Sequence, residues 1–118
     1  MKASEAIAAA DALVPNPFSD AQKLRWMNQI EYRVRVDAKL EDPADVDPIL
    51  AEDVSTTDLT LEDRYQEVYI SWMKSMYYWH MGEYDVYQNE KAMFEAEWLR
   101  FERDLCEALH VGTGGPEH

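Results

Sequence analysis

The sequence has little cysteine, few basic residues and no long apolar run. Its one cysteine, Cys106, excludes an internal disulfide, fits a reducing compartment and is interpreted as a small apolar side chain. No apolar run approaches the ~20 residues of a membrane span, so we expect no membrane contact. Residues 1–13 carry acidic side chains where a signal peptide would continue its apolar region, so we expect a protein that stays in the cytoplasm where it is made.

The shortage of basic residues leaves the chain strongly negative. Eleven Lys and Arg oppose 24 Asp and Glu, for a formal net charge of -13. Such a surface repels DNA and anionic lipid, which argues against direct binding to either. The cations gather in residues 19–40: Lys23, Arg25, Arg33, Arg35 and Lys39. A positive segment in a negative chain can orient copies of the protein against one another.

Aromatic side chains are plentiful: four Trp, seven Tyr and three Phe. Trp and Tyr pair a large apolar body with a polar tip, so they suit interfaces as well as cores. The 118 residues fit one domain, which we place at 1–111. Residues 112–118 hold three of the four glycines and are predicted to form a flexible tail.

Two helices are predicted in the first third of the chain. The first covers about 4–13, an alanine-rich stretch that Ser4 can cap and that must end before Pro15. The second covers about 19–40, because Ser19 and Gln22 have the spacing of a capping box. Its apolar residues follow the spacing of one buried stripe, with Trp26 beside it: Leu24, Met27, Ile30, Val34 and Ala38.

Residues 41–60 are predicted to form an acidic loop. The stretch 41–63 holds nine carboxylates, two prolines and no base. It lacks the glycine and the regular oxygen spacing of an EF-hand, so a solvated connection is favoured over a calcium site. Residues 49–54 are expected to form a brief turn or strand within it.

A long aromatic-rich helix is predicted over about 61–109, capped by Thr60 with Asp63 as its partner. Gly82 lies near its middle, where a glycine costs about 1 kcal/mol relative to alanine, so the helix either bends or breaks there. The apolar positions cover more of the circumference than a compact monomer needs. We therefore expect some of them to contact another chain. Together these elements predict an all-α fold, a small helical bundle.

No convincing catalytic centre or phosphate loop is visible. His80 with Glu83 and Glu107 with His110 have the three-residue spacing of di-metal helical bundles, but one pair adjoins a glycine and the other abuts the tail. A metal site is therefore disfavoured, and a di-metal enzyme is the last of the alternatives. We expect no enzymatic activity and no cofactor.

Two stretches carry a resemblance to a known family. "PNPFSDAQKLRWMNQIE", residues 15–31, is similar to the opening of small helical proteins encoded near the capsid genes of tailed phages and prophages. "YISWMKSMYYWHMGEYDVYQNEKAMF", residues 69–94, resembles their second signature, which here comprises Tyr69, Tyr78, Gly82, Glu83, Tyr84, Tyr87, Asn89, Ala92, Met93 and Phe94. The chain departs from that pattern at 41–63 and at His80. The family is that of the head-to-tail connector, or adaptor, proteins.

The resemblance implies a virion structural protein at the neck of the particle, in a homo-oligomeric ring of about twelve copies that matches the portal. Its implied partners are sister subunits, the portal protein and stopper or tail proteins, while DNA passes the channel without specific binding. The residues predicted to contact subunits or partners are Trp26, Arg33, Arg35, Trp72, Tyr77, Tyr78, Gly82, Tyr84, Tyr87 and Trp98. The alternatives are a head-completion stopper, a tail-terminator subunit, or an acidic regulatory protein that mimics DNA.

Overall fold

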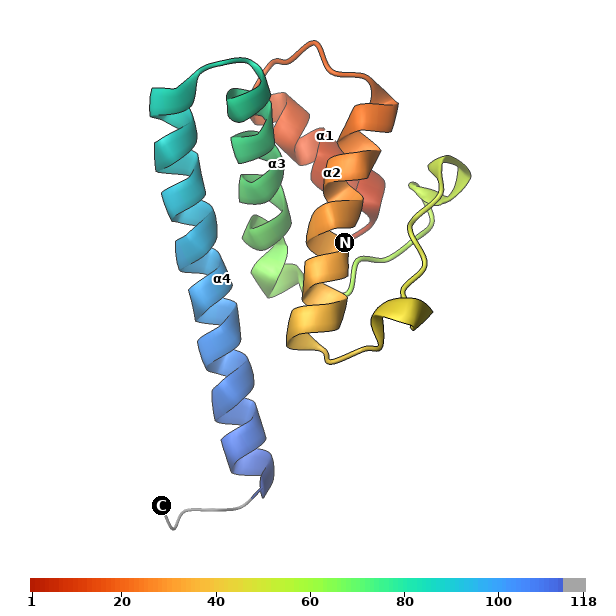
Figure 1. Cartoon of the computed structure of the whole chain (residues 1–118), viewed down its shortest axis with the longest axis vertical. Helices are drawn as coiled ribbons and strands as arrows, with labels where there is room; N and C mark the ends of the chain where they lie inside the picture. Colours follow the sequence, from red (N-terminus) through yellow and green to blue (C-terminus); the bar gives the residue numbers. More distant parts are fainter. Residues whose placement is uncertain (114–118) are drawn as a thin grey trace.

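The structure is a computed structural model that describes residues 1–113, with side chains through residue 109. Its helices are α1 (Ala3–Leu13), α2 (Asp20–Arg33), α3 (Gln66–His80) and α4 (Tyr84–Thr113). The described residues contain no strand beyond a single bridge between Lys2 and Asp58. Figure 1 shows α3 between α4 on one side and α1 and α2 on the other. The predicted all-α bundle is confirmed.

The capping signal of α2 is confirmed and that of α1 is wrong. The Ser19 hydroxyl accepts the Gln22 N–H at 3.2 Å, and the Ser19 N–H donates to the Gln22 side chain at 3.1 Å. Ser4 instead lies inside α1, where its N–H donates to the Val54 carbonyl at 2.8 Å. The helix begins one residue earlier because the acidic loop supplies a backbone partner for its free N–H groups.

The second helix ends close to its predicted limit, in a widened turn. After Arg33 the chain continues as η1 (Val34–Ala38), a π-helical turn, and Leu40 then takes a left-handed φ of 58°. Met27, Ile30 and Val34 are buried as the apolar spacing predicts. Their stripe packs against α3, which fixes the direction of α2 across the bundle.

The acidic loop is irregular apart from short 3₁₀ turns, η2 (Pro43–Asp45) and η3 (Ala51–Asp53), and η4 (Asp63–Tyr65) follows it. Thr60 does not cap a helix as predicted. Its N–H and its hydroxyl donate to the Glu31 carboxylate at 3.1 and 2.7 Å, and α3 begins only at Gln66. The capping box is not formed because the Thr60 N–H, which it would direct to Asp63, donates to a buried carboxylate on α2 instead.

Gly82 breaks the predicted 61–109 helix into α3 and α4. Its φ of +78° is left-handed, a conformation that glycine adopts at low cost. The Gly82 N–H donates to the Trp79 carbonyl at 3.1 Å and the Glu83 N–H to the Tyr78 carbonyl at 2.9 Å. These two bonds form a Schellman motif, which satisfies the last carbonyls of α3 and reverses the chain into an antiparallel hairpin.

The breadth of the aromatic stripe is explained in part by the central place of α3. Contacts with α1, α2 and α4 cover this helix from several sides. It buries residues around most of its circumference: Val68, Tyr69, Ile70, Ser71, Met73, Ser75 and Tyr77. Much of the apolar surplus that predicts a second chain is therefore covered within the protomer.

The α4 helix is twice as long as α3, with 30 residues against 15. Its C-terminal half runs beyond the N-terminal end of α3 (Figure 1). Residues 112 and 113 belong to this helix, so the predicted tail 112–118 begins too early. The rest of that tail lies outside the described residues. No described helix combines the length and apolarity needed to cross a bilayer.

Candidate functional site

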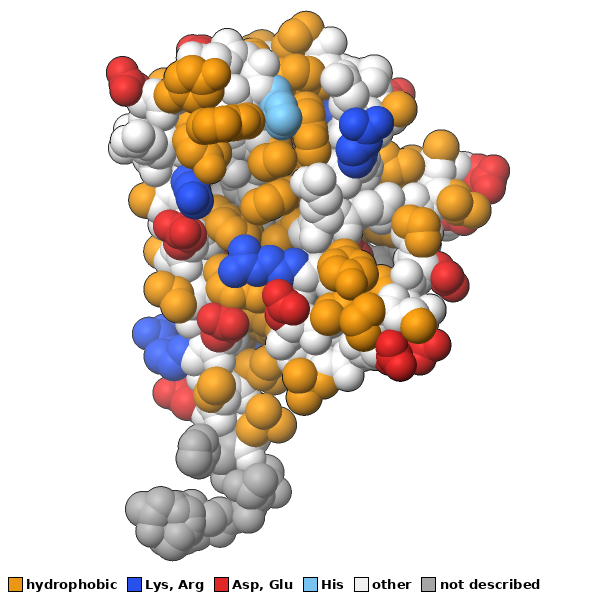
Figure 2. Space-filling view, in the orientation of Figure 1, with side chains coloured by type: hydrophobic (Ala, Val, Ile, Leu, Met, Phe, Trp, Pro, Cys, Tyr) orange, Lys and Arg blue, Asp and Glu red, His pale blue; other side chains and the backbone are white. Residues whose placement is uncertain are grey.

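A groove between α2 and α4, with α3 beneath it, is lined by several aromatic side chains that range from exposed to buried. This aromatic groove is lined by Arg33, Trp72, Ser75, Met76, Trp79, His80, Tyr87, Lys91, Phe94 and Glu95. Figure 2 shows the same face, with apolar side chains between α4 and α2 and basic side chains over them. The groove encloses about 310 Å³, the lower end of the range for ligand pockets and enough for a few side chains.

The rings in and beside the groove contact one another along the α3–α4 hairpin. Trp79 lies 4.9 Å from Tyr84 and 5.0 Å from Tyr87 between ring centroids, and Trp72 lies 5.3 Å from Phe94. All three pairs are tilted, a geometry that suits the aromatic quadrupole. Trp79 keeps 48% of its surface exposed, so one end of this array is open to a partner.

Trp26 joins the α2 wall to the groove. Its indole stacks on the His80 ring at 4.7 Å with an interplanar angle of 18°. Its backbone carbonyl accepts a 2.9 Å hydrogen bond from the Trp72 indole N–H. An indole N–H that enters a protein interior needs such a partner, and the bond fixes the orientation of the Trp72 ring.

Two cations of the groove lie over rings rather than beside carboxylates. The Arg33 guanidinium lies 4.2 Å from the Trp98 centroid and 5.5 Å from that of Phe94, and the Lys91 ammonium lies 6.0 Å from that of Tyr87. Neither Arg33 nor Lys91 makes a salt bridge within the described part of the chain. Cation–π contacts leave a positive charge available to an approaching anion.

Two other cations of the positive segment, Lys23 and Arg35, are neutralised within the protomer. Arg35 binds both carboxylate oxygens of Glu41, at 2.8 and 3.1 Å, and this hydrogen bonding lowers the pKa of Glu41. Lys23 donates to Asp11 at 2.9 Å. The positive segment is therefore less able to attract a second copy than its sequence predicts, and Arg35 stabilises the end of α2 instead.

Asp11 forms a polar cluster that sequence reasoning missed. Its carboxylate accepts hydrogen bonds from Lys23 at 2.9 Å, Tyr77 at 2.8 Å and Asn16 at 3.0 Å. Burial raises the pKa of Asp11, but these three bonds outweigh it and the pKa lies below its ordinary value. Burial and the bond to Asp11 raise the pKa of Tyr77. The cluster ties α1, α2 and α3 together and is structural.

The ten residues predicted for an interface fall into separate groups. Three are buried inside the protomer, where they present no surface to another chain in this conformation: Trp26, Tyr77 and Trp98. Three line the aromatic groove: Arg33, Trp72 and Tyr87. Three lie at or near the hairpin turn: Tyr78, Gly82 and Tyr84. Arg35, as described above, pairs with Glu41.

Sequence reasoning missed Trp79, Lys91 and Phe94 as groove residues. Their helical spacing was visible, but which side of each helix meets α2 depends on the hairpin turn. The His80–Glu83 pair separates at that turn, because His80 ends α3 and Glu83 follows Gly82. Through residue 109, no three His, Cys, Asp or Glu side chains are grouped as metal ligands would be.

Comparisons of the chain with protein-family models, with curated proteins and with solved structures found no match. The candidate site therefore rests on its geometry. It offers ring faces, two cations and one carboxylate, Glu95, in a shallow cleft. These groups can bind an apolar side chain flanked by negative charge, which is the chemistry of a protein contact.

Proposed function

We propose that the protein is a head-to-tail connector, or adaptor, subunit of a tailed phage or prophage. It assembles as a ring below the portal and joins the DNA-filled head to the tail. It is made in the bacterial cytoplasm and resides in the virion neck. Its role is structural, without catalysis or a cofactor.

One observation carries this proposal: the two stretches that resemble the family come together in space. Residues 15–31 supply Trp26, which is buried behind the groove and stacks on His80, and residues 69–94 supply every groove residue except Arg33 and Glu95. These stretches are separated in sequence by 37 residues that include the acidic loop. Residue types shared with a family that pack together, one stretch behind the groove and the other along it, favour a common role for this part of the fold.

The surface has the composition of a protein interface. Trp79, in the groove, and Tyr84, which contacts Trp79, keep 48% and 53% of their surface exposed. Trp, Tyr, Met and Arg are enriched where proteins meet, because they bury large areas and still satisfy their polar atoms. Buried against a partner, these rings supply the central contacts of an interface.

The charge of the chain suits a channel for DNA. In a closed ring each subunit presents two different surfaces, one to each neighbour. The net charge of -13 repels phosphate, so DNA passes such a ring without sticking. The partners in this proposal are sister subunits in about twelve copies, the portal protein, and stopper or tail proteins.

The test is assembly on the portal. The protein is mixed with the portal encoded in the same phage genome, and the products are sized by light scattering and imaged by negative stain. We expect a ring of added density on the tail-facing end of the portal, a position that also distinguishes an adaptor from a stopper. Trp79→Asp abolishes it, whereas Leu13→Asp, at an exposed site on α1, leaves it intact. A protein that stays monomeric and adds no density refutes the proposal.

A further inference from the structure

The aromatic groove is a positive site on a negative molecule. Arg33 and Lys91 reach it without a carboxylate partner in the described residues, while Glu95 is the acidic group in its lining. The whole chain carries more than two acidic residues for each basic one. A local excess of cations over ring faces attracts a segment that is both acidic and apolar.

The acidic loop has this composition. It contains no Lys or Arg, and four of its acidic side chains are exposed and make no salt bridge within the described residues: Asp42, Asp45, Asp47 and Glu52. Leu50 lies among them with 51% of its surface exposed. The loop therefore presents an apolar side chain flanked by carboxylates.

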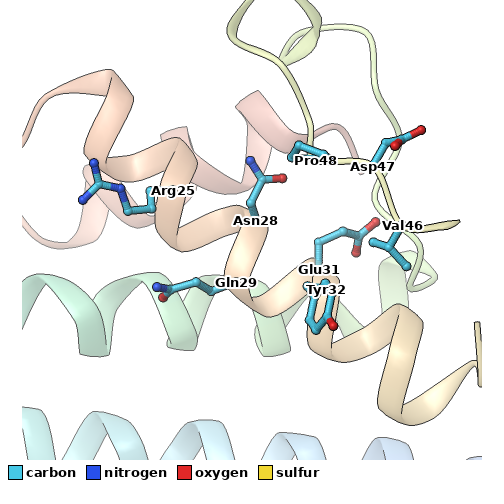
Figure 3. A pocket seen from close by; sticks show the side chains of 8 residues that line it. All are labelled: Arg25, Asn28, Gln29, Glu31, Tyr32, Val46, Asp47 and Pro48. Atoms are coloured by element: carbon cyan, nitrogen blue, oxygen red, sulfur yellow. The ribbon is translucent and has the colours of Figure 1, made fainter. Parts of the chain in front are cut away.

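The loop is held in place before any partner arrives. The Asn28 amide accepts the Ile49 N–H at 2.8 Å and donates to the Ile49 carbonyl at 3.1 Å. The Ile49 side chain is buried, while its neighbour Leu50 is exposed. Figure 3 shows the adjoining pocket, with the Asp47 carboxylate directed away from α2. An ordered loop loses little conformational entropy on binding.

The loop and the groove lie on different sides of the protomer. The loop projects beyond α2, on the side opposite α4, whereas the groove lies between α2 and α4 (Figure 1). A segment anchored to the far side of α2 cannot enter the groove of its own chain. The two surfaces can meet only between copies, and such a contact is heterologous, the type that closes a ring.

We infer that the acidic loop of one subunit occupies the aromatic groove of the next, with Leu50 as its apolar anchor. In this contact Leu50 packs on the rings of Trp79 and Tyr87, and Asp47 and Glu52 approach Arg33 and Lys91. The inference rests on the proposed ring and identifies its subunit interface. Since both halves are charged, assembly weakens as ionic strength rises.

A charge exchange tests the contact. The groove variant carries Arg33→Glu and Lys91→Glu, and the loop variant carries Asp47→Lys and Glu52→Lys. Each variant alone places like charges at every interface, so we expect each to lose the ring on the portal. An equimolar mixture restores it, because the reversed groove accepts the reversed loop and the native groove accepts the native loop.

Two controls separate misfolding from a lost contact. Because Arg33 packs on Trp98, its replacement can disturb the fold, so circular dichroism and thermal melting are recorded for each variant. Lys91 is exposed, so Lys91→Glu alone leaves the fold intact and must still weaken assembly, as the double groove variant does. Leu50→Ser weakens ring formation, whereas Leu13→Ser, a change at another exposed leucine, leaves it unchanged.

The outcomes distinguish this inference from the function on which it rests. If the wild type forms a ring on the portal and both reversed variants do so equally well, the loop–groove contact is wrong and the connector function stands. If the groove variant fails and the loop variant does not rescue it, the groove binds the portal or another protein, and the contact is again wrong. If the wild type forms no ring at all, both proposals fall.

Discussion

Replacing Gly82 by alanine tests the break between α3 and α4, because the sign of the change in stability depends on whether the helix is broken there. Apart from the adjacent residues of the chain, no atom lies within 4 Å of the position that a β-carbon would take at Gly82, so the substitution meets no steric obstacle from the rest of the fold. Its cost comes from the backbone, which has φ of +78°. An L-residue in the left-handed region is destabilised by about 1–2 kcal/mol.

We therefore expect Gly82→Ala to lower the free energy of unfolding by about 1–2 kcal/mol, or the melting temperature by about 4–8 °C. Urea denaturation followed by circular dichroism at 222 nm measures the change. Ala92→Gly is the matched control, since Ala92 is exposed within α4 and glycine there costs about 1 kcal/mol of helix propensity. Glycine is thus preferred at position 82 and alanine at position 92.

A continuous helix through Gly82 makes the opposite prediction. In a bent but unbroken helix, alanine at this position gains about 1 kcal/mol, as it does at any exposed helical site. A Gly82→Ala variant as stable as the wild type, or more stable, therefore refutes the left-handed turn. Gly82→Asn should fall between glycine and alanine, because asparagine tolerates the left-handed region better than alanine does.

Three further predictions concern the polar contacts. Asn28→Ala removes two hydrogen bonds to the backbone of the acidic loop, so it should cost about 1–3 kcal/mol in urea denaturation and speed proteolysis within 41–58. The pKa of Asp11 lies below its ordinary value of 3.8, so its hydrogen bonds stabilise the fold above that pH and are lost as the pH falls further. In Asp11→Asn, the free energy of unfolding should therefore depend less on pH in this acid range. The pKa values of Tyr69 and Tyr77 lie above their ordinary value of 10.0, so stability should fall as the pH rises past 10, by up to about 1.4 kcal/mol per unit for each; Tyr77→Phe should reduce that slope, and Tyr32→Phe, at an exposed tyrosine, should not.

Elements set by local signals were predictable from the sequence. Ser19 and Gln22 are three residues apart and need only each other to cap α2, so their pattern gives the start of the helix correctly. Thr60 has an equally good local pattern, but Glu31, 29 residues earlier in the chain, takes its N–H and hydroxyl. A capping signal thus fails where a distant buried carboxylate accepts the N–H that the capping box needs.

The residue types of the groove were predictable from the sequence, but their position in the fold was not. Its aromatic residues keep helical spacing, and a surplus of such rings is visible in the sequence. Which rings are buried depends on the turn at Gly82, because this turn sets α4 against α3 and directs Arg33 of α2 onto Trp98. Without knowledge of that turn, Trp98 is indistinguishable from an exposed residue such as Trp79. Tyr77 is buried instead on the α1–α2 side, by contacts with Asp11 and Trp26 that no local pattern predicts.

Because α4 is longer than α3, the local stability of α4 differs between its two ends. Near Phe94 its amides lie beside α3, and opening them requires Phe94 and Trp98 to leave the core. Beyond Leu105 the helix has lost that neighbour, and the side chains of 106–109 are exposed. Hydrogen exchange of the α4 backbone amides should accordingly become faster toward the C-terminal end. The helix opens locally from that end, one turn at a time, while the bundle stays folded.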